Sequence, residues 1–157
     1  MHTAIETLAG LAILANGVIY GTDVFGALVL CPAMGAVDDR TLTQATGHIH
    51  RIADRRIAAI SIGGLIVTAA TTALAAATGH WVSTAAAALA TLALIIFAVV
   101  YTRISKPVNT ALTAAALADR VPGDTRQLQA RWDSVINARV ALQTIALGAL
   151  CVALAGA

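Results

Sequence analysis

The stretch 126–143, RQLQARWDSVINARVALQ, decides how the chain folds because it passes from polar to apolar composition. Positions three and four apart share one face of a helix. One such face carries Trp132, Ile136, Arg139 and Gln143. A charged residue inside a membrane segment is costly and usually faces a partner in the bundle interior. The sequence therefore predicts that Arg139 lies on an interior face that it shares with an aromatic anchor.

The composition indicates a protein built into a membrane. The chain has 157 residues, of which 59% are hydrophobic and 11% charged, and its mean hydropathy is +0.82. Soluble domains are about half apolar and about a quarter charged. Each membrane helix needs about 20 apolar residues, so four helices nearly use up the chain. We expect an all-α, integral membrane four-helix antiparallel bundle. It would form a single domain, 1–157, with spans at about 5–31, 57–77, 82–105 and 134–155.

Polar and helix-breaking residues mark the expected helix ends. Pro32 should end the first helix, because the residue before a proline is pushed out of the helical region. Pro107 should either kink the third helix or open a new first turn. Asp38 or Asp39 could cap a helix that begins near Thr41 and runs on into the second span.

The basic residues indicate how the bundle is oriented. All ten lie in or beside the first and third connections, at Arg40, Arg51, Arg55, Arg56, Arg103, Lys106, Arg120, Arg126, Arg131 and Arg139. Basic connections stay in the cytoplasm, so we expect a multi-pass cell-membrane protein with both termini outside. The basic residues are scattered along membrane edges and mixed with acids, so no nucleic-acid partner is expected.

A polar stripe on the first helix is the first candidate site. Asn16, Tyr20 and Asp23 are spaced four and three apart, which places them on one face. An Asp23–Arg139 pair would neutralise both charges. Such a pair could simply hold two helices together. Together with Gln143 it could also form a polar pocket for a substrate or a proton, and the two interpretations are compatible.

The second candidate is a histidine segment that precedes the second span. His50 and Asp54 lie four apart and could share a metal or a proton, but a zinc, copper or iron site needs three or four ligands. His48 lies about 200° away around the helix, in line with Arg51 and Arg55. We therefore predict no cofactor, with a metal at His50 and Asp54 as the less favoured alternative. His48 would be a headgroup-level residue or a proton acceptor at the pocket mouth.

Three weaker signals concern the pocket mouth and assembly. Asn109, which follows Pro107, could line the cytoplasmic mouth of the bundle. Gly17 and Gly21 form a G-x-x-x-G pair that lets two helix backbones approach closely, so a homo-oligomer is one expected partner besides the lipid bilayer. Cys31 and Cys151 should lie near opposite sides of the bilayer, too far apart for a disulfide.

Four segments carry a resemblance to a known family. They are 30–34 (LCPAM), 50–57 (HRIADRRI), 106–109 (KPVN) and 131–133 (RWD), the last followed by Arg139. With these segments nearly the whole chain resembles the anthrone oxygenase-like family of small four-helix membrane proteins. One position departs from the family pattern. Where relatives often have a histidine, this chain has Ile136, with Asn137 beside it.

The resemblance implies an enzyme that oxidises a lipophilic aromatic molecule, an anthrone, to a quinone with O₂ and without an obvious cofactor, in a polyketide or other secondary-metabolite pathway. Asp23 or His48 would be the base, and Arg139 would stabilise the developing anion. The candidate substrate-binding residues are Asn16, Tyr20, Asn109, Trp132, Asn137 and Gln143. A small transporter, or an accessory or assembly protein without activity, is the alternative.

Overall fold

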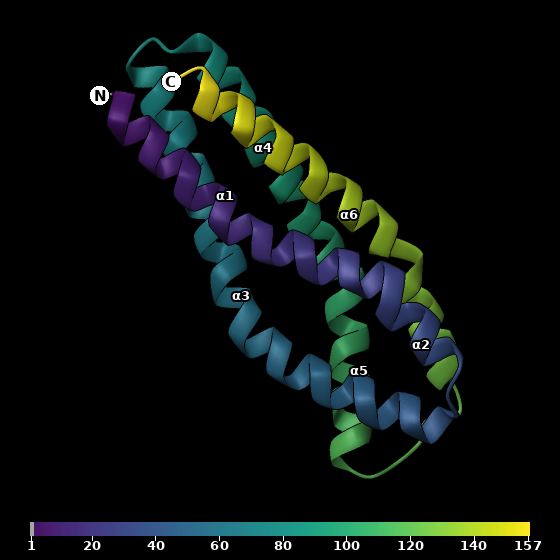
Figure 1. Ribbon diagram of the computed structural model, residues 1–157. Helices are drawn as coiled ribbons and strands as arrows, with labels where there is room; N and C mark the ends of the chain where they lie inside the picture. The colour runs from purple at the N-terminus through teal and green to yellow at the C-terminus, as the bar shows by residue number, and fades with distance from the viewer. Residues whose placement is uncertain (1) are drawn as a thin grey trace.

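The computed structural model describes residues 2–157, and across them the chain forms four long helical segments packed as one bundle (Figure 1). The first segment joins α1 (His2–Phe25), a π-helical turn (Gly26–Leu30) and α2 (Cys31–Gly35). The second is α3 (Asp39–Ala77). The third joins α4 (Trp81–Val100), a second π-helical turn (Tyr101–Ser105) and α5 (Lys106–Leu117), and the fourth is α6 (Thr125–Ala155).

The predicted all-α four-helix bundle is confirmed. All four segments within residues 2–157 are long and apolar enough to cross a membrane. Short connections join neighbours, so successive helices run antiparallel. The two termini and the turn before α4 lie at the same end (Figure 1). The opposite end holds the connections 36–38 and 118–124, and we call it the basic end.

The prediction that Pro32 ends the first helix is wrong. The helix continues to Gly35, because a π-helical turn precedes the proline and Cys31 N–H donates to Gly26 O across it. A proline inside an α-helix collides with the carbonyl four residues earlier. The extra residue of a π turn displaces that carbonyl and removes the collision.

The third segment uses the same device at its proline. Lys106 N–H donates to Tyr101 O across the second π turn, and Pro107 then stands in the first turn of α5. Of the two expected outcomes, Pro107 therefore opens a new first turn, and the helical path is not interrupted. Both π turns, Gly26–Leu30 and Tyr101–Ser105, lie toward the basic end.

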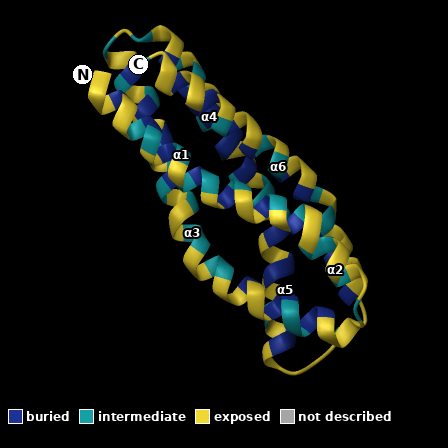
Figure 2. Ribbon diagram, viewed as in Figure 1, coloured by how far each residue is buried: buried dark blue, intermediate teal, exposed yellow. Residues whose placement is uncertain are grey.

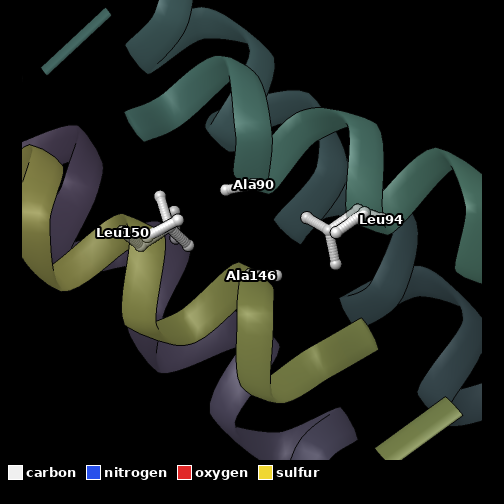
Figure 3. Packing of buried hydrophobic residues seen from close by; sticks show 7 residues of the cluster. Ala90, Leu94, Ala146 and Leu150 are labelled. Carbon is white, nitrogen blue, oxygen red and sulfur yellow. The ribbon is translucent and has the colours of Figure 1, made fainter. Parts of the chain in front are cut away.

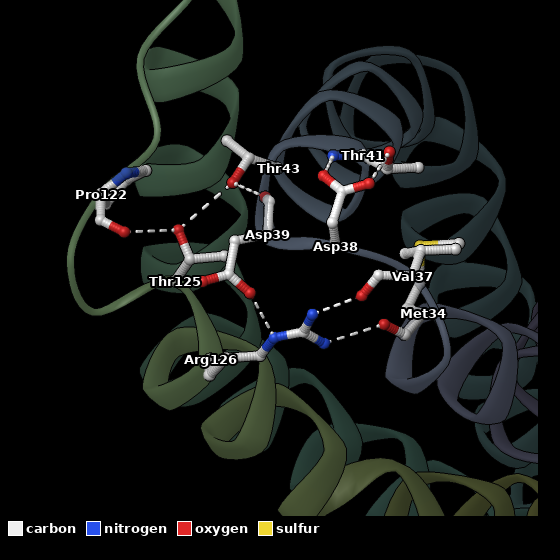
Figure 4. A network of polar contacts seen from close by, with 9 residues as sticks. All are labelled: Met34, Val37, Asp38, Asp39, Thr41, Thr43, Pro122, Thr125 and Arg126. Carbon is white, nitrogen blue, oxygen red and sulfur yellow. Dashed lines mark hydrogen bonds and ion pairs between the residues drawn. The ribbon is translucent and has the colours of Figure 1, made fainter.

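The predicted cap of α3 is confirmed. Asp38 is the N-cap, and its Oδ1 accepts from Thr41 N–H at 2.9 Å (Figure 4). Hydrogen bonds from the Thr41 backbone and hydroxyl hold the pKa of the Asp38 carboxyl below its usual value. The cap fixes where α3 begins. From there α3 runs as one continuous helix from Asp39 to Ala77.

A polar network ties the two connections of the basic end together (Figure 4). Arg126 on α6 donates to the Asp39 carboxylate at 2.6 Å and to the backbone carbonyls of Met34 and Val37. Thr125 and Thr43 share a buried hydroxyl–hydroxyl hydrogen bond at 3.2 Å. These bonds join the start of α6 to the end of α2 and the start of α3.

Small residues allow the helices to pack closely. In the half of the bundle near the termini, Ala90 and Leu94 of α4 meet Ala146 and Leu150 of α6 (Figure 3). Alanines at such an interface let helix backbones approach in lipid. At the basic end α3 approaches α5 so closely that a Cβ on Gly47 would lie 2.5 Å from Leu112 O. Glycine is therefore required at that crossing.

The outside of the bundle is apolar. Figure 2 shows exposed residues along the outer faces of the helices and buried residues along the inner ones. Large apolar side chains such as Leu14 and Trp81 are more than 70% exposed, at 71% and 72%. An apolar exterior of this kind suits a helix bundle in lipid, where every backbone group is satisfied within a helix.

Candidate functional site

A cavity of about 590 Å³ lies inside the basic half of the bundle. Its volume lies within the size range of ligand sites, about 300–1,000 Å³. All four long segments of the bundle contribute residues to its wall. Most of its wall is apolar and includes Ile19, Phe25, Ile57, Ile62 and Phe97. The polar residues of the wall are Asp23, His50, Asp54, Ser61, Tyr101, Asn109, Trp132 and Arg139, with Thr22, Thr102 and Lys106 at exposed positions.

The predicted Asp23–Arg139 pair is confirmed and forms part of this wall. Arg139 Nη2 lies 2.6 Å from Asp23 Oδ1, and Arg139 Nε lies 3.3 Å from Asp23 Oδ2. The third contact, from Arg139 Nη1 to Ser105 Oγ, is 3.0 Å. The two side chains are only 9% and 3% exposed, so this is a buried, two-point ion pair between α6 and α1. Such pairs are strong when both partners stay in place.

Three aromatic rings surround the guanidinium of Arg139. Its central carbon lies 5.2 Å from the ring centre of Phe97, 5.4 Å from Trp132 and 5.9 Å from Tyr101. Cations are attracted to aromatic faces within about 6 Å. The ion pair and the rings together hold the positive charge at a fixed point of the cavity wall.

A second polar group, made of Asp54, Tyr101 and Asn109, also forms part of the cavity wall. Asp54 Oδ1 accepts from Tyr101 Oη at 2.8 Å and from Asn109 Nδ2 at 2.9 Å. The three residues come from α3, the second π turn and α5. Asn109 was predicted to line the mouth of the bundle, and it does line the cavity. The roles of Asp54 and Tyr101 were not predicted, because their contacts depend on how three helices meet.

His50 supplies a buried imidazole to the same cavity. It is 6% exposed, and its ring lies 5.7 Å from that of Trp132. No hydrogen bond joins its ring to another residue in the part of the chain that the structure describes. A neutral imidazole without a protein partner can accept a proton or a hydrogen bond from a bound molecule.

His48, which was predicted as a base at the pocket mouth, lies outside the cavity. It is exposed on the outer face of α3 with Arg51 and Arg55, as the helical spacing predicted. The spacing of Gly47, His50 and Asp54, three and four apart, is the signal that could have identified the inner face. Gly47 must face α5 at the close crossing, which turns His50 toward the interior.

Four of the six predicted substrate-binding residues lie outside the cavity wall. Asn16 is buried and donates to Ala12 O at 2.8 Å and to Thr68 Oγ1 at 3.3 Å, which joins α1 to α3. Tyr20 is partly buried, and Asn137 is exposed on α6. Gln143 is fully buried, and neither polar atom of its amide has a hydrogen-bond partner within residues 2–157. Among the predicted substrate-binding residues, the cavity wall holds Trp132 and Asn109.

The metal alternative at His50 and Asp54 gains no further ligand from the fold. Within residues 2–157, no group of three or more His, Cys, Asp or Glu side chains is placed to hold a metal ion. Two side chains alone do not make up the ligand set of a structural or catalytic transition-metal site. Asp54 is instead occupied by two hydrogen bonds from uncharged groups.

Comparison with known proteins identified no relative of this chain. No family model matches the sequence, and no curated protein or solved structure matches it either. The chemistry of the cavity is therefore the basis for a proposal about function.

Proposed function

We propose that this protein is an integral membrane enzyme that oxidises a lipophilic aromatic molecule of the anthrone type with O₂. The observation that carries the proposal is the cavity, which combines an unbonded imidazole, a fixed guanidinium and a largely apolar wall. The resemblance of four sequence segments to the anthrone oxygenase-like family points to the same chemistry.

The proposed reaction needs a proton acceptor and a group that stabilises a negative charge. An anthrone has a weakly acidic CH₂ between two aromatic rings, and a base takes one of its protons. The electron-rich carbanion transfers one electron to O₂, and the radical and superoxide combine into a C–O bond. The resulting peroxide anion takes up one proton and becomes a hydroperoxide. Removal of its remaining C–H proton expels hydroxide from the O–O bond and gives the quinone carbonyl, and the proton and hydroxide together make one water. One anthrone and one O₂ thus yield one quinone and one water.

The cavity residues fit these needs in the following way. His50 is the proposed base, because its ring lines the cavity and makes no hydrogen bond to another residue within 2–157. Arg139 supplies positive charge near the developing oxyanion. Asp23 is less suited to act as the base, since both of its oxygens already accept from Arg139. Phe25 and Ile62, which line the cavity and are exposed on the outside of the bundle, would give a lipophilic substrate access from the bilayer.

Occupancy of the cavity can be tested through its tryptophan. The chain has two tryptophans, and Trp81 is exposed at the far end of the bundle. In a Trp81→Phe variant, we expect an anthrone added without oxygen to quench Trp132 fluorescence saturably, because both would share the cavity. The matched Trp132→Phe variant, in which Trp81 alone reports, should show only weak quenching without saturation. Equal quenching curves for the two variants would count against a ligand site at Trp132.

The orientation in the membrane belongs to the same proposal. The ten basic residues cluster at and beside the basic end, which supports a cytoplasmic location for that end and an outside location for both termini. In a cysteine-free background, a membrane-impermeant thiol reagent should label Trp81→Cys in intact cells and Arg120→Cys only after lysis. Both positions are exposed, so the reverse pattern would overturn the orientation.

A further inference from the structure

The outer face of α3 carries a basic groove that the cavity chemistry does not use. Arg51, Arg55 and Arg56 line it around Ile52, and its volume is about 250 Å³. Their spacing of four and one along the helix brings three guanidinium groups to one side. His50 and Asp54 face the cavity on the other side of the same helix.

The three arginines have no acidic partner in the part of the chain that the structure describes. Ion pairs between residues 2–157 instead involve Arg40, Arg126 and Arg139. The nearest acid along α3, Asp54, lies in the cavity wall and accepts from Tyr101 and Asn109. The groove therefore has a concentrated positive charge that no acidic group among the described residues neutralises.

The groove also lies at a defined level of the helix. Directly after Arg56, α3 enters the stretch 57–77, which contains no charged residue and has the length of a membrane span. A residue just before such a span sits at the depth of the lipid phosphates. Ile52, which is 55% exposed, presents an apolar surface within the same groove.

We propose that this groove binds the phosphate group of an anionic membrane lipid. Guanidinium groups donate two parallel hydrogen bonds to phosphate oxygens, and three arginines line this groove. The apolar side chain of Ile52 would contact the glycerol and upper acyl region of the same lipid. Basic clusters on the cytoplasmic side of a membrane helix attract anionic lipids, and the groove adds a shaped site to this attraction.

Binding can be measured with the full-length protein in nanodiscs of a zwitterionic phosphatidylcholine that contain a trace of fluorescent phosphatidylglycerol. Energy transfer from the protein to the labelled lipid would report occupancy, with unlabelled phosphatidylglycerol as competitor. We expect Arg51→Gln/Arg55→Gln to weaken the apparent affinity about tenfold, because the variant removes two of the three guanidinium groups that line the groove and would contact the lipid phosphate directly. The control Arg103→Gln/Arg120→Gln removes the same charge from exposed positions outside the groove and should weaken binding less than twofold.

Two further outcomes are decisive. Equal weakening by the two double variants would show that only total charge matters and would overturn the site. Inorganic phosphate that competes at millimolar concentration as well as phosphatidylglycerol does would also overturn it, because the groove would then take free phosphate. A melting temperature in detergent for each variant shows that the fold is intact, and Arg51→Lys provides a milder change should Arg51→Gln fail to fold.

Discussion

Asp23→Ala lowers the free energy of unfolding by about 3–5 kcal/mol, because it leaves the buried guanidinium of Arg139 without its counter-charge. Both carboxylate oxygens of Asp23 accept from Arg139, and both side chains are almost fully buried. The matched control is Glu6→Ala on the same helix, since Glu6 is exposed and takes part in no ion pair within residues 2–157. Its effect should stay within about 0.5 kcal/mol.

Thermal unfolding in a single detergent measures both variants. A double variant, Asp23→Ala/Arg139→Ala, tests whether the destabilisation by Asp23→Ala comes from the unpaired charge of Arg139. If the loss of unfolding free energy in Asp23→Ala comes mainly from the unpaired charge of Arg139, the double variant is more stable than Asp23→Ala alone. Identical melting temperatures for Asp23→Ala and Glu6→Ala would show that the ion pair does not stabilise the bundle.

His50→Ala lowers the turnover of an anthrone by about 100-fold or more, because general-base catalysis contributes about 10²–10⁴ in rate. The imidazole of His50 lines the cavity and makes no hydrogen bond to another described residue, so its removal deletes the proton acceptor and leaves the ion pair in place. His48→Ala, which removes an exposed imidazole two residues away, should keep turnover within a factor of about two.

The pair of histidine variants decides between two assignments of the base. Rates should be measured at saturating anthrone, with melting temperatures recorded beside them. A large loss in His48→Ala with little change in His50→Ala would favour His48, one of the two bases predicted from the sequence. Turnover at the wild-type rate in both variants would mean that neither histidine is the base.

Simple periodicity was sufficient for the parts of the site that lie on one helix. The spacing of Trp132, Ile136 and Arg139 predicted an interior face of α6, and all three are buried. Because a buried charge in a membrane segment needs a partner of opposite charge, Asp23 was predicted as the partner of Arg139. The cap at Asp38 followed in the same way from local chemistry.

Contacts between helices set the features that the sequence alone did not reveal. Tyr101 and Asn109 reach Asp54 because a π turn shifts the register before Pro107. His50 faces inward because α3 is held against α5 at Gly47, where no side chain fits. Both effects depend on packing between segments that are far apart in the sequence.

We propose that the cavity catalyses an oxidation by O₂. The most direct measurement is the initial rate of quinone formation from an anthrone by the purified protein in detergent, with and without O₂, above the rate without protein. We expect O₂-dependent formation of one quinone for each O₂ consumed in wild-type protein and in His48→Ala, and a rate about 100-fold lower, or lower still, in His50→Ala. The protein used must be folded and must bind the anthrone at Trp132. Quinone formation by this protein at no more than the spontaneous rate would contradict the proposed oxidation.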